Sequence, residues 1–117
     1  MTKKIAWIVS VKIKSDDLKA FSVLVDTIAK TAENEPGTLA YLVNFNENKT
    51  ECCIFEQFAD CNSVLLHIDV FGKEFAHRFM DLCSIESMVA IGNPNKALKD
   101  AMSGFSPKWM FTETGFS

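Results

Sequence analysis

Residues 5–13, IAWIVSVKI, decide the fold of this chain. Large apolar side chains occupy every second position of this segment, namely Ile5, Trp7, Val9, Val11 and Ile13. A period of two is typical of a β-strand, because successive side chains point to opposite faces of a sheet. The positions between them begin with Ala6 and Ile8 and are also mainly apolar, so the strand is expected to be covered on both faces.

A helix is predicted directly after this strand. Residues 15–17, SDD, supply an N-cap and acidic first-turn side chains. Apolar residues then recur at spacings of three and four, which predicts an amphipathic helix over about residues 16–33. Residues 35–37, EPG, end the helix, because proline cannot continue it and glycine tolerates the turn.

The next segments predict a β-hairpin. Residues 38–46, TLAYLVNFN, and residues 51–59, ECCIFEQFA, both have strand composition. The four polar residues 47–50, ENKT, connect them. A loop this short joins antiparallel strands, so the two segments are expected to pair with each other.

A second helical region is predicted to start at the cap-rich residues 60–63. An apolar stripe at helical spacing runs from Val64 to Leu82, and Gly72 marks the expected break or kink. Residues 86–91, ESMVAI, are predicted to form a fourth strand.

The clearest capping signal in the chain lies at Asn93 and Pro94. Asn93 is predicted to be the N-cap, and Pro94 the first residue, of a short helix that ends near Met102. The tail residues 108–112, KWMFT, predict a short aromatic strand. One protomer offers this strand no obvious place, so we expect it to pair with the sheet edge of a second copy.

The order of these elements is strand, helix, strand, strand, helix, strand, followed by a short C-terminal helix and strand. This is the order of the ferredoxin-like α+β fold, and residues 1–117 are expected to form a single domain. Helices packed on one face of the sheet leave the other face open. A second copy packed sheet against sheet is the simplest cover, so we expect a homodimer.

Composition argues against several classes of function. The chain has 117 residues and a net charge of −3, which gives no electrostatic basis for binding nucleic acid. No apolar stretch approaches the ~20 residues of a membrane span, and we expect a cytoplasmic protein. The four cysteines have neither disulfide-framework nor zinc-site spacing, so we expect reduced thiols and no metal.

Three short stretches resemble one known family. They are residues 35–41, EPGTLAY, residues 55–60, FEQFAD, and residues 64–67, VLLH. Their order and spacing resemble the antibiotic biosynthesis monooxygenase family, the dimeric α/β-barrel proteins that include quinol monooxygenases. The resemblance implies a homodimeric, cofactor-independent monooxygenase that acts on a quinol- or anthrone-like aromatic molecule in an apolar pocket.

The resemblance singles out His67 and Glu56 as catalytic candidates. His67 is the expected base, because a histidine titrates near neutral pH and lies in the helix motif. Glu56 follows Phe55 in a strand, where an acid needs a partner or has a raised pKa. The alternative is that both are ordinary structural residues, His67 as a half-exposed helix residue and Glu56 as a hydrogen-bonding partner.

Aromatic and polar side chains are the substrate-binding candidates. They are Trp7, Tyr41, Asn44, Phe75 and Phe79. Tyr41 and Asn44 lie on opposite faces of their strand, so at most one of them shares a pocket with any one neighbour. Aromatic residues at this spacing form core more often than a binding site, although a core with a gap is itself a pocket.

Two other functions stay open. The first is a non-catalytic dimer of the same fold that binds small molecules. The second is a haem-binding or haem-degrading relative, which would need an asparagine on the first strand. That strand offers Ala6, Ile8 and Ser10 instead, which counts against haem.

Overall fold

The computed structural model describes residues 2–117 and contains one five-stranded sheet. The strands are β1 (Ile5–Ile13), β2 (Thr38–Phe45), β3 (Glu51–Phe58), β4 (Cys83–Ile91) and β5 (Lys108–Met110), in the order β2-β3-β1-β4-β5. The strand β1 lies at the centre and pairs antiparallel with both β3 and β4. The predicted ferredoxin-like α+β fold is confirmed.

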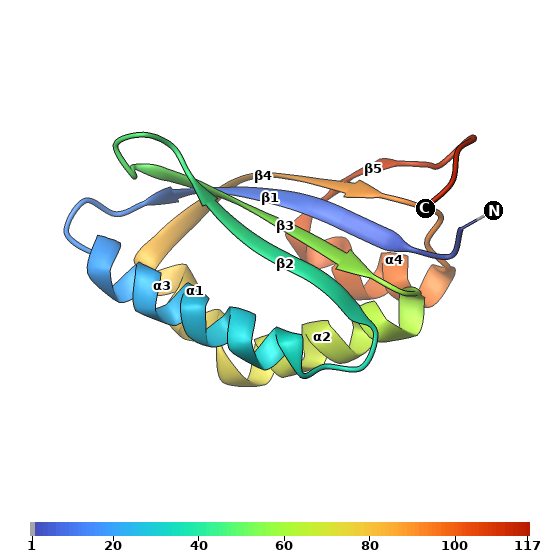
Figure 1. The fold of residues 1–117 in the computed structure, drawn as a ribbon, viewed down its shortest axis with the longest axis horizontal. Coiled ribbons are helices and arrows are strands. Elements are labelled where there is room, and N and C mark those ends of the chain that lie inside the picture. The colour runs from blue at the N-terminus through green and yellow to red at the C-terminus, as the bar shows by residue number, and fades with distance from the viewer. Residues whose placement is uncertain (1) are drawn as a thin grey trace.

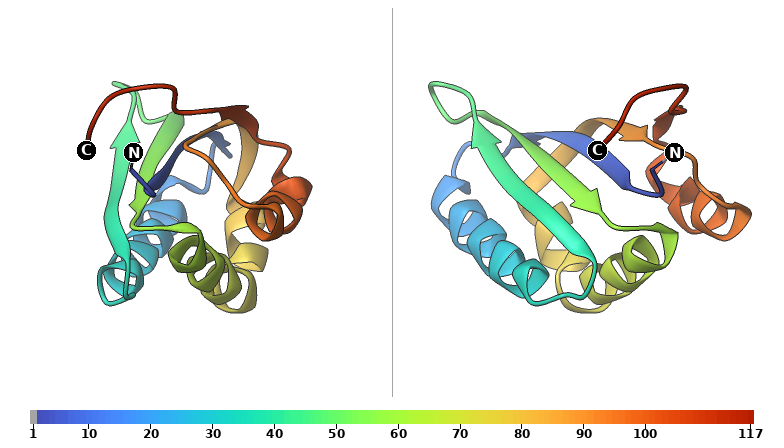
Figure 2. Two further views of the ribbon diagram at one scale, coloured as in Figure 1. Left: turned by 90° about the vertical axis from the view of Figure 1, so that its right-hand side faces the viewer. Right: turned by 45° about the vertical axis from the view of Figure 1, so that its right-hand side comes forward.

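The helices cover one face of this sheet (Figures 1 and 2). They are α1 (Leu18–Glu33), α2 (Cys61–Glu74), α3 (Ala76–Leu82) and α4 (Lys96–Met102), followed by the 3-10 turn η1 (Ser103–Phe105). The apolar stripe of α1 packs inward through buried residues that include Phe21 and Ile28. The core therefore lies between one sheet face and the helices, where the odd-numbered positions of β1 point.

Two helix boundaries differ from the prediction. Gly72 lies inside α2, and the break between α2 and α3 falls at Phe75, whose backbone leaves helical geometry at φ −127°. The N-cap of α4 is Asn95, whose side chain accepts a hydrogen bond from the backbone of Leu98 at 2.9 Å. The predicted cap at Asn93 was two residues early, because Pro94 precedes the helix and a second asparagine performs the capping.

The tail strand β5 also differs from the prediction. It pairs in parallel with β4 of the same chain, through Val89–Lys108, Ala90–Trp109 and Ile91–Met110. The helix α4 provides the crossover that a parallel pair requires, so β5 pairs with the sheet edge of its own chain and not with that of a second copy. Figure 1 shows β5 beside β4.

The second face of the sheet carries no helix among residues 2–117, and only the C-terminal segment crosses it (Figure 2). On this face Leu42, Phe55, Ile8 and Val89 stand side by side across four strands. Leu42 is 57% and Ile8 39% exposed. None of the helices formed by the described residues is long and apolar enough to cross a membrane.

Candidate active site

Three polar or aromatic side chains form a row across the helix-facing side of the sheet. Trp7 on β1 is paired with Glu56 on β3, and Glu56 is paired with Tyr41 on β2. Directly opposed residues of antiparallel strands project to the same face, so the three side chains are neighbours. Strand register therefore brings together residues from three separate parts of the sequence.

The helix α2 places His67 above this row. Asp60 caps the helix, because its side chain accepts a hydrogen bond from the backbone of Ser63 at 2.9 Å. The side that α2 turns to the sheet carries Ser63, Val64 and His67, all of them buried. His67 lies one turn after Ser63 and points at the sheet.

The turn after α1 brings Glu35 to the same point. Gly37 has φ +85°, a conformation that other residues rarely adopt, and a Cβ atom there would collide with Ser63 Oγ. This close approach holds the turn against the start of α2. Thr38 Oγ1 donates a hydrogen bond to Glu35 Oε1 at 3.1 Å, which orients the carboxylate.

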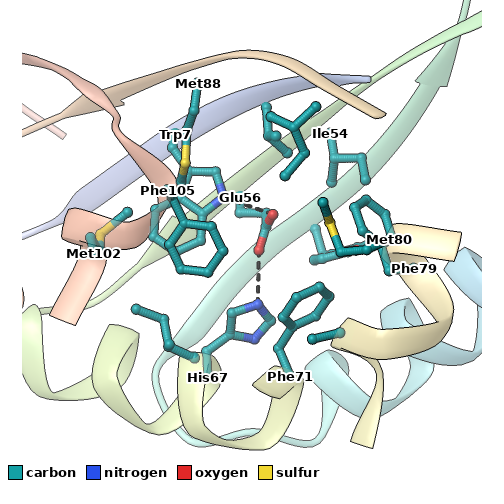
Figure 3. A pocket seen from close by; sticks show the side chains of 15 residues that line it. Trp7, Ile54, Glu56, His67, Phe71, Phe79, Met80, Met88, Met102 and Phe105 are labelled. Carbon is teal, nitrogen blue, oxygen red and sulfur yellow. Dashed lines mark hydrogen bonds and ion pairs between the residues drawn. The ribbon is translucent and has the colours of Figure 1, made fainter. Parts of the chain in front are cut away.

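The result is a buried chain of ion pairs centred on His67, of which Figure 3 shows the Glu56–His67 pair. His67 Nδ1 lies 2.7 Å from Glu35 Oε1, and His67 Nε2 lies 2.9 Å from Glu56 Oε1. Trp7 Nε1 donates a hydrogen bond to Glu56 Oε2 at 2.7 Å. Glu56 is 5% and His67 4% exposed, so little water screens these interactions.

The two carboxylates favour the protonated form of His67. Burial by itself lowers the pKa of His67, but the hydrogen bonds and negative charges of Glu56 and Glu35 exceed this effect and raise the pKa above its usual value. The geometry agrees, because within residues 2–117 Glu56 Oε1 has no hydrogen-bond donor other than a proton on His67 Nε2. An imidazolium satisfies both carboxylates at once.

Aromatic rings surround this imidazolium. The ring of Phe58 lies 5.1 Å from that of His67, Tyr41 lies 6.2 Å away and Trp7 6.3 Å away, measured between centroids. Of these three rings, that of Phe58 lies within the distance of about 6 Å over which an aromatic ring attracts a cation.

An apolar cavity opens beside the ion pairs. Its volume is about 110 Å³, and its lining comes mainly from Val, Ile, Met and Phe side chains. Glu56 and His67 both line it (Figure 3). Met80 on α3 is 49% exposed and Phe105 on η1 is 37% exposed, so these two side chains border the mouth. The cavity thus combines an apolar wall with an acid–base group at its inner end.

Most of the residues predicted from sequence line this cavity. Trp7, Tyr41, Glu56, His67 and Phe79 belong to its wall. Phe75 is buried but does not belong to the wall, because it lies at the break before α3, where the Arg78 guanidinium stacks on its ring. Asn44 is exposed on the other sheet face and donates hydrogen bonds to the backbone of Leu42 and Cys53.

Several site residues were missed from sequence. The sequence indicates Glu35 only as a helix-ending signal and as part of a motif, although the side chain is a direct partner of His67. The one sequence feature that could have indicated a role for Glu35 is its position directly before the Pro36-Gly37 turn. Met80, Met88, Met102 and Phe105 also line the cavity, and nothing in their spacing predicted it.

The cysteines supply no nucleophile to the site. All four are free. Burial raises the pKa of the Cys52 thiol to about 11 and that of Cys83 to about 12, so both are thiols at neutral pH.

A haem ligand is not available at His67 either. Both of its ring nitrogens already contact carboxylates, so neither is free to coordinate iron. Ala6, Ile8 and Ser10 of β1 alternate with the helix-facing residues and so point away from the cavity.

Solved structures with the same fold give a wider context. MupZ from Pseudomonas fluorescens superposes with a TM-score of 0.87 at 22% identity, over 100% of this chain and 91% of MupZ. A variant of SnoaB, a cofactor-independent oxygenase from Streptomyces nogalater, superposes with a TM-score of 0.67 at 10% identity, over 76% of this chain and 91% of SnoaB.

A protein from Nitrosomonas europaea, provisionally named an antibiotic biosynthesis monooxygenase, superposes with a TM-score of 0.55 at 16% identity, over 89% of this chain and 80% of that protein. No protein-family profile and no curated protein matches the sequence. At these identities the likeness concerns the fold. The protein therefore has the fold of the antibiotic biosynthesis monooxygenases.

Proposed function

We propose that this protein is a cofactor-independent monooxygenase that oxidises an electron-rich, quinol- or anthrone-like ring held in the apolar cavity. The observation that carries the proposal is the buried Glu35–His67–Glu56 chain at the inner end of that cavity. Such a chain can move a proton where water is excluded, which is what cofactor-free oxygenation requires of a protein.

Within this proposal Glu56 is the base and His67 is its charged partner. A base must have a free electron pair, and an imidazolium has none. Glu56 Oε2 accepts a hydrogen bond from Trp7, and Oε1 is ion-paired with His67 Nε2 at 2.9 Å, so each oxygen keeps a lone pair for a substrate proton. This assignment reverses the roles expected from the sequence, in which His67 was the base.

The reaction balances without a cofactor. Glu56 takes a proton from an acidic ring CH₂ or OH group, and the electron pair stays on the ring as an anion. The anion reduces O₂. For an anthrone-like CH₂ group, one oxygen atom ends as the new carbonyl and the other leaves as water, so the CH₂ group supplies all the hydrogen and the electrons.

The size of the cavity limits what enters it. At about 110 Å³ it is smaller than the cavity of roughly 150 Å³ that holds benzene in another protein. We therefore propose that only the reacting edge of the substrate enters and that the rest of the molecule extends past Met80 and Phe105. Methionine side chains on the wall adapt to different shapes, which suits such a partial fit.

A homodimer is part of the proposal. Leu42, Phe55, Ile8 and Val89 form a continuous apolar row on the open face, the type of surface that a second copy would cover. Sedimentation should give a dimer, and Leu42→Lys should give monomers. A lone wild-type protomer at micromolar concentration would contradict this part of the proposal.

A second candidate is an oxygen-independent proton-transfer enzyme. The ion-pair chain has two carboxylates and one imidazolium, so its net charge is negative. A negative site disfavours a long-lived substrate anion. It suits a reaction in which one substrate atom loses a proton while a second atom of the substrate gains one.

The test compares turnover in air and under nitrogen. The metal-stripped protein is mixed with a panel of quinols, anthrones and monocyclic phenols, and oxygen uptake is recorded together with product mass after labelling with ¹⁸O₂. We expect uptake with one labelled oxygen atom in the product. Turnover under nitrogen would favour the second candidate, and binding without turnover would favour a non-catalytic binding protein.

A further inference from the structure

Tyr41 has the one uncommitted hydrogen-bond donor among the side chains that line the cavity. Trp7 Nε1 is bonded to Glu56, and both ring nitrogens of His67 contact carboxylates. The other lining residues besides Glu56 are apolar. Within residues 2–117 no protein group forms a hydrogen bond with the Tyr41 hydroxyl, and this hydroxyl is not among the fully buried polar atoms, so it stays available to a bound molecule.

We propose that the Tyr41 hydroxyl donates a hydrogen bond to the substrate oxygen on which negative charge develops when Glu56 takes the proton. The inference rests on the proposed function and adds a substrate-binding donor to it. It also narrows the substrate class to molecules with an oxygen atom, phenolic or ketonic, conjugated to the acidic position.

Register places the hydroxyl on the correct side of the sheet. Tyr41 lies directly opposite Glu56 in the β2–β3 ladder, so both side chains project into the same face and flank the same cavity. The Tyr41 ring is 6.2 Å from the His67 ring, which packs it against the ion-pair chain. A substrate oxygen near Glu56 is therefore also near Tyr41.

The protonation state suits a donor. Burial, followed by the charge of Glu56, raises the pKa of Tyr41 above its usual value, with smaller contributions from Cys52 and Glu35. Tyr41 thus keeps its proton and cannot act as the base. It offers an O–H group at neutral pH.

The change in charge during the reaction explains why a donor is needed. Before proton transfer the ion-pair chain is net negative and would repel an anionic substrate. After Glu56 has accepted the proton the chain is neutral, and the new charge lies on the substrate. A fixed donor directed at that charge stabilises the transition state more than the ground state.

The experiment uses 4-nitrophenol as the probe, because its phenolate is coloured and its titration needs no turnover. We compare the pKa of the bound probe in the wild type, in Tyr41→Phe and in the surface control His77→Gln. Tyr41→Phe removes only the hydroxyl. We expect the bound probe to titrate about one pKa unit higher in Tyr41→Phe, the size of a lost hydrogen bond to a charged group, and unchanged in His77→Gln.

A second readout uses the fact that the chain has a single tyrosine. Labelling with 3-fluorotyrosine gives one ¹⁹F signal, and we expect it to shift when 4-nitrophenol binds. In turnover, Tyr41→Phe should lower kcat about 100-fold with little change in KM.

The inference is overturned if the bound probe titrates identically in wild type and Tyr41→Phe, or if the wild type does not bind the probe at all. The probe titration and the oxygen-uptake assay can fail independently, so failure of the Tyr41 inference is distinguishable from failure of the proposed function. A probe shift without oxygen uptake supports the donor and contradicts the monooxygenase. Oxygen uptake without a shift in the pKa of the probe supports the monooxygenase and contradicts the role of Tyr41 as a donor.

Discussion

Nδ1 of His67 lies 2.7 Å from Oε1 of Glu35, although 32 residues separate them in the chain. This contact joins the turn after α1 to the middle of α2. Because Glu56 contacts the other ring nitrogen, each of the two imidazole nitrogens lies against a carboxylate. The site is therefore an imidazolium held between two acids, and the predictions below follow from that arrangement.

Replacing Glu56 by Gln should abolish most of the activity. The amide still accepts a hydrogen bond from Trp7, so the fold should persist, but it cannot accept a substrate proton. We expect kcat to fall about 100- to 10,000-fold, the usual range for loss of a general base. Steady-state oxygen uptake measures kcat. The control is Glu74→Gln, a change at an exposed residue. Activity close to wild type in Glu56→Gln would mean that another group takes the proton.

Glu35→Gln should change the pH profile of activity. The amide oxygen can still accept the Nδ1 proton of His67, but the negative charge is gone, so the pKa of His67 should fall. If catalysis needs the imidazolium, activity declines as pH rises through that pKa, and the alkaline limb of kcat should move to lower pH. The control is Glu33→Gln, an exposed acid at the end of the same helix. An alkaline limb that stays in place would show that the charge of Glu35 does not act through His67.

Stability should fall as pH rises above neutrality. The folded-state pKa of His67 is raised above its usual value of 6.5, so its contribution is complete below 6.5 and is lost as pH rises through the folded-state value. Urea unfolding between pH 6 and 8 stays one unit below the ordinary thiol pKa of 9.0, so ionisation of the cysteines in the unfolded state contributes little. His67→Gln should flatten the slope and His77→Gln should not. An equal slope in wild type and His67→Gln would contradict the assignment.

Gly37→Ala should destabilise the protein and disturb the site together. The φ of +85° is strained for alanine, and the new Cβ would meet Ser63 Oγ. We expect a loss of about 1–3 kcal/mol in the free energy of unfolding, measured with urea. Gly72→Ala is the matched control, because Gly72 lies inside α2 with open space around it, and it should stabilise by up to ~1 kcal/mol. Equal effects in the two variants would mean that the Gly37 turn is not constrained.

Local patterns predicted the parts of the fold that depend on short-range chemistry. The alternation in residues 5–13 gave β1 with its bounds, and the EPG sequence ended α1 within two residues of its observed end. The polar turn at residues 47–50 correctly predicted the β2–β3 hairpin. In each case the deciding side chains are neighbours in sequence.

The errors arose where distant segments compete or combine. Two asparagines flank Pro94, and only the geometry of the folded loop selects Asn95 as the cap. The strand β5 pairs with β4 because α4 carries the chain back to that edge, which no local pattern encodes. Glu35 gained its role only when α2 was placed over the sheet, because its partner lies in a separate element.

The protonation of His67 tests the central claim most directly. Protein labelled with ¹⁵N-histidine has two imidazoles, and the exposed His77 provides the second set of signals. Nitrogen chemical shifts recorded across a pH titration report whether each ring nitrogen carries a proton. We predict that the imidazolium of His67 loses its proton only at a pH above 6.5, the usual pKa of histidine. A His67 that becomes neutral, with one bare nitrogen, at or below 6.5 would contradict the account.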